Sequence, residues 1–195
     1  MPFELESVHL GEIKVIVPQV FPDHRGFFME AYRKDQFAAL GIPDEFLQEN
    51  QSRSTYGVIR GLHFQWDAPM ANLMRVTLGR VFLVAVDIRK GSPTVGEWFG
   101  LEVSAENRRQ VFAPAGFARG FAVLSEVAEL QYKCTSLYNS RAEGSIRWDD
   151  PEIGIEWPIS DPVMSDKDRY AQTLAEWLAS EEANYLAYQP SSERL

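Results

Sequence analysis

Arg60 and His63 are the residues whose types and positions are best suited to chemistry. Both interrupt an apolar segment that is typical of a strand, Val58-Ile59-Arg60-Gly61-Leu62-His63-Phe64-Gln65. Imidazole is the side chain that exchanges protons near neutral pH, and a guanidinium can hold a phosphate or carboxylate through two hydrogen bonds. A lone histidine in a strand is also often structural, so this segment alone leaves both interpretations open.

Further polar side chains lie beside apolar or turn segments elsewhere in the chain. They are Arg25 with Glu30, Tyr132, Tyr138, and Asp168 next to Lys167. A phenol, a carboxylate and cations are the groups that proton transfer on an anionic substrate needs beside an imidazole. Their presence favours the functional interpretation of His63.

The sequence supports a metal site or a cysteine nucleophile less well than it supports proton transfer. The three histidines are His9, His24 and His63, and no second histidine stands two residues after His63, as a metal-binding β-barrel would require. The single cysteine, Cys134, is in a β-type segment and is expected to be a small buried residue. We therefore expect no metal and no cofactor. A metal-dependent barrel remains an alternative that metal analysis would settle.

Composition and charge narrow the class of protein. The 195 residues carry 19 Lys and Arg against 28 Asp and Glu, a formal net charge of −9. This acidic balance is opposite to the basic surface of nucleic-acid-binding proteins. No apolar run approaches the ~20 residues of a membrane span, and the acidic start of the chain differs from a secretory signal. With one cysteine, a cytoplasmic protein with neither nucleic-acid nor membrane partners is expected.

The elements that must position these side chains are mainly strands. Short β-type segments recur between Gly, Pro, Asp and Asn, and the run 81–86 is apolar on both faces. Residues 34–40 predict a short helix, and 166–188, capped by Ser165, predict one long helix. The strands are expected at 13–20, 27–32, 58–64, 74–78, 80–88, 97–103, 109–112, 121–124, 129–135 and 145–148. The pattern indicates a single domain over residues 1–195, an antiparallel β-sandwich or jelly roll with few helices.

Seven blocks along residues 10–170 give a more specific indication. In order along the chain they resemble the dTDP-4-dehydrorhamnose 3,5-epimerase family; any one block is a weak signal, but the ordered set is strong. The blocks are Asp23-x-Arg25-Gly26-Phe27-Phe28-x-Glu30, Gln48-Glu49-Asn50, Gly57-Val58-Ile59-Arg60-Gly61-Leu62-His63-Phe64-Gln65, Val86-Asp87-Ile88-Arg89, Ser104-Ala105-Glu106-Asn107, Ile146-Arg147-Trp148-Asp149-Asp150-Pro151 and Ser165-Asp166-Lys167-Asp168.

The resemblance implies a fold, a reaction and residue roles. It implies a cupin-like jelly roll that works without metal, as a homodimer that exchanges strands between subunits. By resemblance His63 is the base that removes a proton beside a ketone, Asp168 orients its imidazole, and Tyr132 returns a proton on the opposite face. A phenol with a pKa near ~10 stays protonated at neutral pH and suits that role.

The resemblance also implies substrate contacts. Tyr138 matches a residue that stacks on the nucleobase. Arg25, Arg60 and Lys167 match groups that meet the diphosphate and nearby oxygens. The positions that match contacts to nucleotide or sugar are Glu30, Gln48, Asn50 and Glu143.

Two positions depart from the family pattern. Asn72 stands where the family has a lysine, and Arg119 stands where Gly-Phe-Ala-His-Gly-Phe has its histidine. We hypothesise that Arg119 restores in the same pocket the positive charge that Asn72 lacks. An amide can still donate a hydrogen bond to an enolate oxygen, but charge-assisted bonds are roughly twice as strong.

The resemblance implies a cofactor-independent epimerase that inverts C3 and C5 of a dTDP-4-keto-6-deoxyhexose, in deoxysugar biosynthesis. The two departures leave alternatives open: an epimerase of C3 alone, or one that acts on another nucleotide-4-keto sugar. A third alternative is a nucleotide-sugar-binding protein that lost catalysis when the lysine became Asn72.

Overall fold

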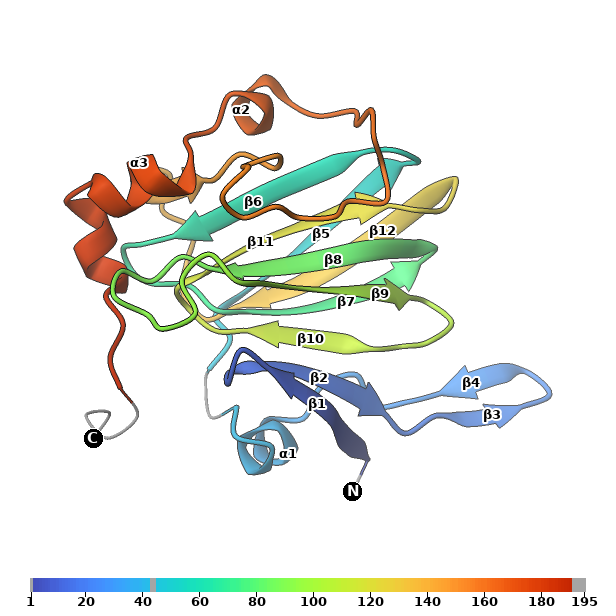
Figure 1. Cartoon of the computed structure of the whole chain (residues 1–195). Helices are drawn as coiled ribbons and strands as arrows, with labels where there is room; N and C mark the ends of the chain where they lie inside the picture. The colour runs from blue at the N-terminus through green and yellow to red at the C-terminus, as the bar shows by residue number, and fades with distance from the viewer. Residues whose placement is uncertain (1, 43–44, 191–195) are drawn as a thin grey trace.

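Two antiparallel β-sheets lie face to face in the computed structural model, which describes residues 2–42 and 45–190 (Figure 1). The first sheet has the strand order β1 (Phe3–His9), β2 (Ile13–Pro18), β10 (Gln110–Ala113), β7 (Asn72–Leu78), β12 (Val127–Cys134) and β5 (Gln48–Thr55). The second has the order β13 (Glu143–Ser145), β6 (Ile59–Gln65), β11 (Phe117–Val123), β8 (Arg80–Asp87) and β9 (Trp98–Ser104). The expected antiparallel sandwich is confirmed.

The remaining elements lie outside the two sheets. A separate hairpin, β3 (Phe21–Asp23) and β4 (Gly26–Phe28), projects away from the sandwich (Figure 1). Helix α1 (Lys34–Ala39), which the sequence predicted, packs on the six-stranded sheet through Phe37. Three short helical segments, α2 (Asp166–Arg169), α3 (Leu174–Ala179) and η1 (Glu182–Leu186), lie toward the C-terminus.

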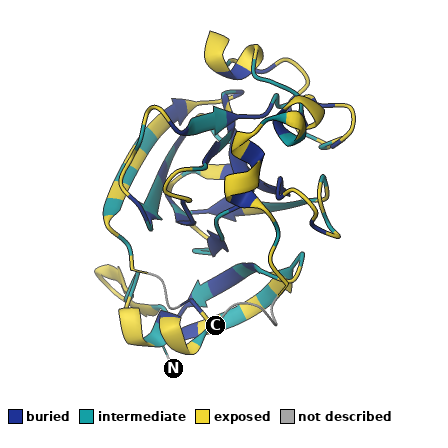
Figure 2. Cartoon of the chain, turned by 90° about the vertical axis from the view of Figure 1, so that its left-hand side faces the viewer, coloured by how far each residue is buried: buried dark blue, intermediate teal, exposed yellow. Residues whose placement is uncertain are grey.

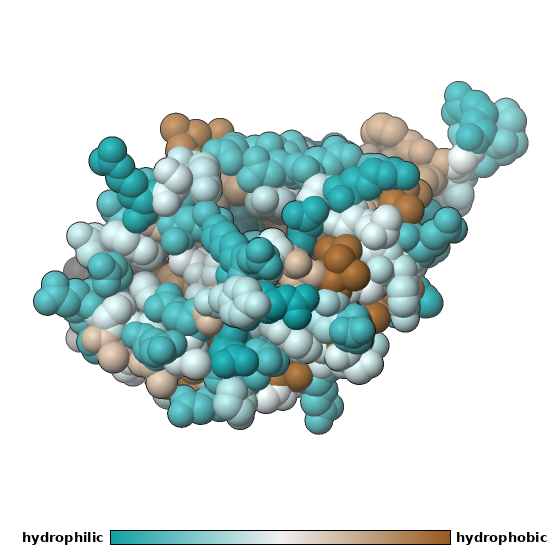
Figure 3. Space-filling view, turned by 90° about the horizontal axis from the view of Figure 1, so that it is seen from above, coloured by the Kyte–Doolittle hydropathy of each residue, from teal (hydrophilic) through white to brown (hydrophobic). Residues whose placement is uncertain are grey.

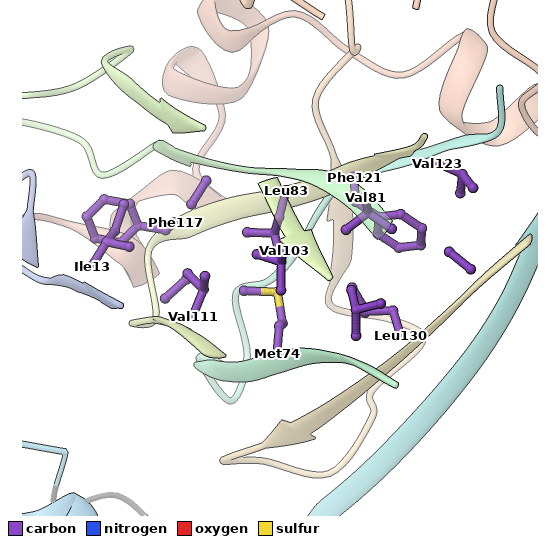
Figure 4. Close-up of a cluster of buried hydrophobic side chains, with 14 residues drawn as sticks. Ile13, Met74, Val81, Leu83, Val103, Val111, Phe117, Phe121, Val123 and Leu130 are labelled. Carbon is purple, nitrogen blue, oxygen red and sulfur yellow. The ribbon is translucent and has the colours of Figure 1, made fainter. Parts of the chain in front are cut away.

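The main core fills the space between the sheets (Figure 4). Met74 and Leu130 of one sheet meet Leu83 and Phe121 of the other, and Figure 2 shows buried residues along both sets of strands. The five-stranded sheet is also covered outside, where Val84 and other side chains pack with α3 and η1. The predicted burial of 81–86 on both faces is confirmed. Since burial removes apolar area from water on two faces, this sheet is a stable support for its side chains.

The single long helix predicted for residues 166–188 is wrong. Gln172 forms a parallel bridge with Ile146, and the Arg147 amide donates to the Gln172 carbonyl oxygen over 2.9 Å, so the chain is extended between α2 and α3. Thr173 and Glu176 then form a capping box that begins α3. The predicted Ser165 cap is confirmed, because its hydroxyl accepts from the Asp168 amide.

Several strand predictions were also wrong. Strands β1 and β5 were missed, and β5 (Gln48–Thr55) consists of eight polar residues, Gln-Glu-Asn-Gln-Ser-Arg-Ser-Thr, with none of the apolar residues that indicate a strand. The strand expected at 27–32 ends at Phe28, within the β3–β4 hairpin, whose first strand was also missed. The strand expected at 145–148 is instead β13 (Glu143–Ser145), because the next residue, Ile146, forms a bridge with Gln172. None of these differences changes the predicted fold class.

Two facing glycines let β6 and β11 approach closely. A Cβ atom on Gly61 would lie 2.5 Å from the Gly120 Cα, and one on Gly120 would lie 2.8 Å from the Arg60 carbonyl oxygen. Gly61 also has a φ of +129°, in the region that favours glycine. The register between the strands shifts at this point, beside the pair of residues Arg119 and His63. The glycines therefore allow a close approach of the two strands that carry Arg119 and His63.

The surface is predominantly polar on the face seen in Figure 3, with separate apolar patches and the projecting hairpin at its edge. Among the described residues, no helix has the length and apolar character needed to span a membrane.

Candidate active site

A cavity of about 290 Å³ opens between the two sheets, next to the main core. Its apolar wall includes Phe64, Met70, Met74, Phe121 and Leu130. Its polar lining consists of Gln48, Asn50, Ser52, Arg60, His63, Gln65, Asn72, Arg119, Tyr132, Tyr138 and Glu143, which come from strands of both sheets and the segment after β12. An apolar wall with convergent polar groups is typical of a small-molecule site.

A larger hollow of about 640 Å³ lies elsewhere, beside the β1–β2 turn and the C-terminal segment. Its buried cation, Arg89, is paired with Asp87 and Glu12 and stacks over Phe117. A guanidinium neutralised by two carboxylates has no charge left for an anionic ligand. The chemistry therefore favours the smaller cavity.

His63 and Asp168 form the first functional pair. The His63 Nε2 lies 2.6 Å from Asp168 Oδ1, and the Gly61 amide donates to Asp168 Oδ2 over 3.4 Å. With a carboxylate accepting from Nε2–H, the imidazole presents the Nδ1 lone pair. Asp168 is held by the first turn of α2, where its amide donates to Ser165 Oγ. The short helix thus places a carboxylate behind a histidine of the neighbouring sheet.

Asp168 remains ionised in this setting. Burial alone would raise its pKa, but the hydrogen bond and charge of His63, with the bonds from Gly61 and Ser165, together hold the pKa below its ordinary value of 3.8. A carboxylate that stays charged at neutral pH can orient and stabilise an imidazolium.

Tyr132 lies in the opposite sheet from His63. It belongs to β12, pairs with Asn50 of β5 and Met74 of β7, and packs partly against the core. Both Tyr132 and His63 line the cavity. A phenol and an imidazole on opposite walls can act on opposite faces of one bound molecule.

Tyr138, Glu143 and Lys167 form a linked group beside the cavity. The Tyr138 hydroxyl donates to Glu143 Oε2 over 2.9 Å, and Lys167 Nζ lies 2.6 Å from the same oxygen. Burial opposes ionisation of Glu143, but these two partners hold its pKa below the ordinary value. The Glu143 hydrogen bond raises the pKa of Tyr138, which keeps this exposed phenol neutral.

Arg60, Gln48 and Asn50 also line the cavity, as their predicted roles require. Arg60 Nε donates to Ser54 Oγ over 3.0 Å, and Gln48 Nε2 donates to Asn50 Oδ1 over 3.0 Å. The remaining donors of the exposed Arg60 guanidinium make no hydrogen bond to the described part of the chain.

The two departures from the family pattern both lie in the cavity wall. Asn72 is buried in β7, where its Nδ2 donates to Cys134 Sγ over 3.2 Å and to the Lys133 carbonyl oxygen over 3.3 Å. Arg119 is buried in β11, and its Cα pairs with that of His63 across the strands. Their shared location is the one that the charge-compensation hypothesis requires.

Arg25 and Glu30 do not reach this cavity. Arg25 sits at the tip of the β3–β4 hairpin, with its side chain 78% exposed and paired with Asp23. Glu30 follows the hairpin and contacts Arg33. The hairpin projects away from the sandwich, so both side chains are separated from the group that includes His63 (Figure 1).

Ser52 is a cavity residue that the sequence reasoning missed. Its hydroxyl is buried in the cavity lining and has no hydrogen-bond partner in the described chain. It follows Gln48 and Asn50 at intervals of two, so all three side chains point to one face of β5. The spacing of two residues between the predicted contacts Gln48 and Asn50 is a signal that could have identified both the strand and Ser52.

Metal ligands do not gather in the described residues, where no group of three or more His, Cys, Asp or Glu side chains could hold an ion. The buried Cys134 has a pKa raised mainly by burial, so its thiol is a neutral partner of Asn72.

Comparison with known proteins identifies relatives along most of the chain. Residues 7–176 match the family model described as dTDP-4-dehydrorhamnose 3,5-epimerase. The chain is 50% identical over 169 residues to the dTDP-4-dehydrorhamnose 3,5-epimerase of Pseudomonas aeruginosa, which covers 86% of this chain and 93% of that protein. It is 40% identical over 164 residues, 83% of this chain and 79% of the other, to a dTDP-4-dehydrorhamnose 3-epimerase of Streptomyces niveus.

A solved structure agrees with these sequences. The 3,5-epimerase of Legionella pneumophila, crystallised with dTDP-4-keto-L-rhamnose, superposes with a TM-score of 0.90 at 44% identity, covering 96% of this chain and 99% of that one. The sandwich, the cavity and these matches lead to one conclusion: the chain belongs to the dTDP-4-dehydrorhamnose 3,5-epimerase family.

Proposed function

We propose that this protein epimerises a dTDP-4-keto-6-deoxyhexose at C3 and C5 without a cofactor, a step of deoxysugar biosynthesis. The observation that carries the proposal is the pair of proton-transfer groups, His63 and Tyr132, on opposite walls of one cavity, with Asp168 behind the histidine. Inversion of a carbon requires removal of a proton from one face and delivery to the other.

Each inversion proceeds through an enolate. His63 Nδ1 takes the proton from the carbon beside the ketone, and the C–H electron pair moves into a carbon–carbon double bond while the carbonyl pair moves onto O4. Tyr132 returns a proton to the other face as the carbonyl re-forms. Asp168 stabilises the imidazolium between these events. Solvent then takes the proton from His63 and restores that of Tyr132.

The proposal includes the substrate contacts that the family resemblance implies. Tyr138 stacks on the nucleobase, and Arg60 and Lys167 meet the diphosphate and nearby oxygens. Gln48, Asn50 and Glu143 contact nucleotide or sugar. Support for the dTDP-linked sugar comes from the names of the relatives and from the molecule bound to the Legionella protein.

The test of this function is conversion of dTDP-4-keto-6-deoxyglucose in ordinary water, followed by proton NMR. Inversion at C3 and C5 changes the couplings between ring protons, and the proposed double epimerase alters those of both centres. A change in the couplings at C3 alone supports epimerisation of C3 only, the activity for which the Streptomyces niveus relative is named. An unchanged spectrum with tight binding supports the silent binding protein, with Asn72 as its cause.

The position of Arg25 on the projecting β3–β4 hairpin supports the proposal of a homodimer. The hairpin that carries Arg25 exposes Phe27 and Phe28 to 54% and 67%, an unusual exposure for aromatic side chains. Inserted beside the cavity of a second copy, the hairpin would cover these rings and bring Arg25 to the diphosphate. Each site would then combine His63 of one copy with Arg25 of the other.

Mixing two inactive variants tests this exchange. Arg25→Ala and His63→Asn each remove a group from every site, so either homodimer is expected to be nearly inactive. After the subunits are mixed and re-equilibrated, activity is expected to return to about a quarter of the wild-type value, because half of the dimers are mixed and each holds one intact site of two. Absence of any recovery, with mixed dimers demonstrated by native mass spectrometry, would show that both residues serve one chain's own site.

The proposed compartment is the cytoplasm. The substrate of the proposed reaction carries a charged diphosphate, and such a molecule does not diffuse through a bilayer core, where isolated charges are costly. Enzyme and substrate are therefore expected in the same aqueous compartment.

A further inference from the structure

Arg119 is a buried cation with unused hydrogen-bond donors in the cavity wall. It is only 8% exposed, and its Nη1 donates to the carbonyl oxygens of Met70 and Phe117 over 2.9 and 2.8 Å. Its Nε and Nη2 make no hydrogen bond to the described chain, and no described carboxylate forms an ion pair with it. Two carbonyl groups thus fix one end of the guanidinium and leave the other end unpartnered.

This placement is costly to the folded protein. Burial lowers the pKa of Arg119 to about 10, only partly offset by the nearby Tyr132 and Cys134. The side chain is still protonated at neutral pH, so the fold holds a positive charge without a counter-ion. A lowered pKa for a base means that the charged form is less stable in the folded chain than in the unfolded one. Such a cost is often retained where it serves a function.

Asn72 does not supply the same interaction. Its two amide hydrogens are directed to Cys134 Sγ and to the Lys133 carbonyl oxygen. The amide therefore has no free donor for a ligand, although Asn72 lines the cavity. Arg60 also lines it, but its side chain is exposed to water, which weakens its field.

We propose that Arg119 is a catalytic residue, whose Nε and Nη2 edge donates to the C4 carbonyl oxygen of the substrate and stabilises the negative charge of the enolate. The inference rests on the proposed epimerase function. Arg119 and His63 are paired residues of adjacent strands, so the cation lies beside the base. The carbonyl oxygen must lie near the base as well, because it is bonded to the carbon next to the one that loses its proton.

The chemistry gives this role a distinctive consequence. Loss of the C3 proton forms a C3–C4 enolate, and loss of the C5 proton forms a C4–C5 enolate. Both place their charge on O4. A group that stabilises O4 therefore accelerates proton exchange at both C3 and C5. A group that contacts the substrate at one carbon affects proton exchange at that carbon only.

The test is the rate of deuterium exchange at C3 and C5 of dTDP-4-keto-6-deoxyglucose in D2O for Arg119→Met. Both rates are expected to fall in parallel by about 100-fold or more, as when an oxyanion donor is removed elsewhere. Binding of dTDP alone, which has no ketone, is expected to stay unchanged. The melting temperature is not expected to fall, because an uncompensated charge has been removed. Arg119→Lys, which keeps the charge, is expected to recover part of both rates.

Arg119→Gln is the second variant, since its amide can still donate to the Met70 carbonyl oxygen if the methionine variant does not fold. Arg53→Met is the matched control. Arg53 is exposed on β5, pairs with Glu129 outside the cavity, and its loss is expected to leave exchange unchanged.

Wild-type exchange rates in folded Arg119→Met or Arg119→Gln would overturn the role of Arg119 and leave the epimerase function intact. A fall in the exchange rate at one carbon alone would also overturn this role. So would a loss of dTDP binding as large as the fall in the exchange rates. Absence of exchange in the wild-type protein would instead reject the proposed function, and this inference with it.

Discussion

The His63→Asn variant is expected to lose about 10³- to 10⁴-fold in turnover of the keto sugar, the upper range for removal of a general base. Asparagine keeps a polar side chain of similar size beside Asp168 but cannot accept a proton at neutral pH. Binding of dTDP is expected to stay within about twofold of wild type, because the nucleotide contacts lie elsewhere in the site. Initial rates and titration with dTDP measure the two effects separately.

Asp168→Asn provides the internal check on that result. Because Asp168 acts through the imidazole, the double variant His63→Asn, Asp168→Asn is expected to be no slower than His63→Asn alone. His9→Asn is the matched control. His9 stacks on Phe99, bonds to Ser7 and lies outside the cavity, so its replacement is expected to leave turnover unchanged. Full turnover by His63→Asn would exclude His63 as the base.

The Tyr132→Phe variant is expected to separate proton exchange from inversion. Phenylalanine keeps the ring that packs on the core but has no proton to return, so inversion is expected to fall by about 100- to 1,000-fold. His63 can still remove a proton and return a deuteron to the same face. Deuterium is therefore expected to enter the substrate with retention of configuration, measured by mass increase together with NMR couplings.

Tyr56→Phe is the control for this comparison, because Tyr56 is exposed and does not line the cavity. If Tyr132→Phe inverts C3 and C5 at the wild-type rate, another group donates the proton. If exchange and inversion fall by the same factor, Tyr132 acts before the enolate forms and is not the donor on the far face.

Much of the fold and of the cavity could be predicted from the sequence because the informative residues are local. The apolar runs around β6 and β8 mark the buried strands, and the sequence blocks around His63 and Asp168 occur in the same order along the chain as in the family. Strand β5 was missed because its residues are polar, and their alternation places Gln48 and Asn50 in a cavity that only the folded chain forms. A pattern for apolar strands does not detect such a segment.

Other features depend on contacts that sequence does not display. The predicted C-terminal helix is interrupted because Gln172 pairs with Ile146, a tertiary bridge that outweighs helix propensity between Ser165 and Thr173. The separation of Arg25 from His63 follows from the direction of a projecting hairpin. Individual hydrogen bonds in the cavity wall use both amide hydrogens of Asn72 but only the Nη1 end of the Arg119 guanidinium.

Whether the protein removes protons on both sides of the ketone can be measured by incubating the wild-type protein with dTDP-4-keto-6-deoxyglucose in D2O and locating deuterium with proton NMR. Proton abstraction beside the ketone by His63, on both sides of one carbonyl group, predicts deuterium at C3 and at C5. Ordinary hydrogen at both carbons after prolonged incubation would contradict it.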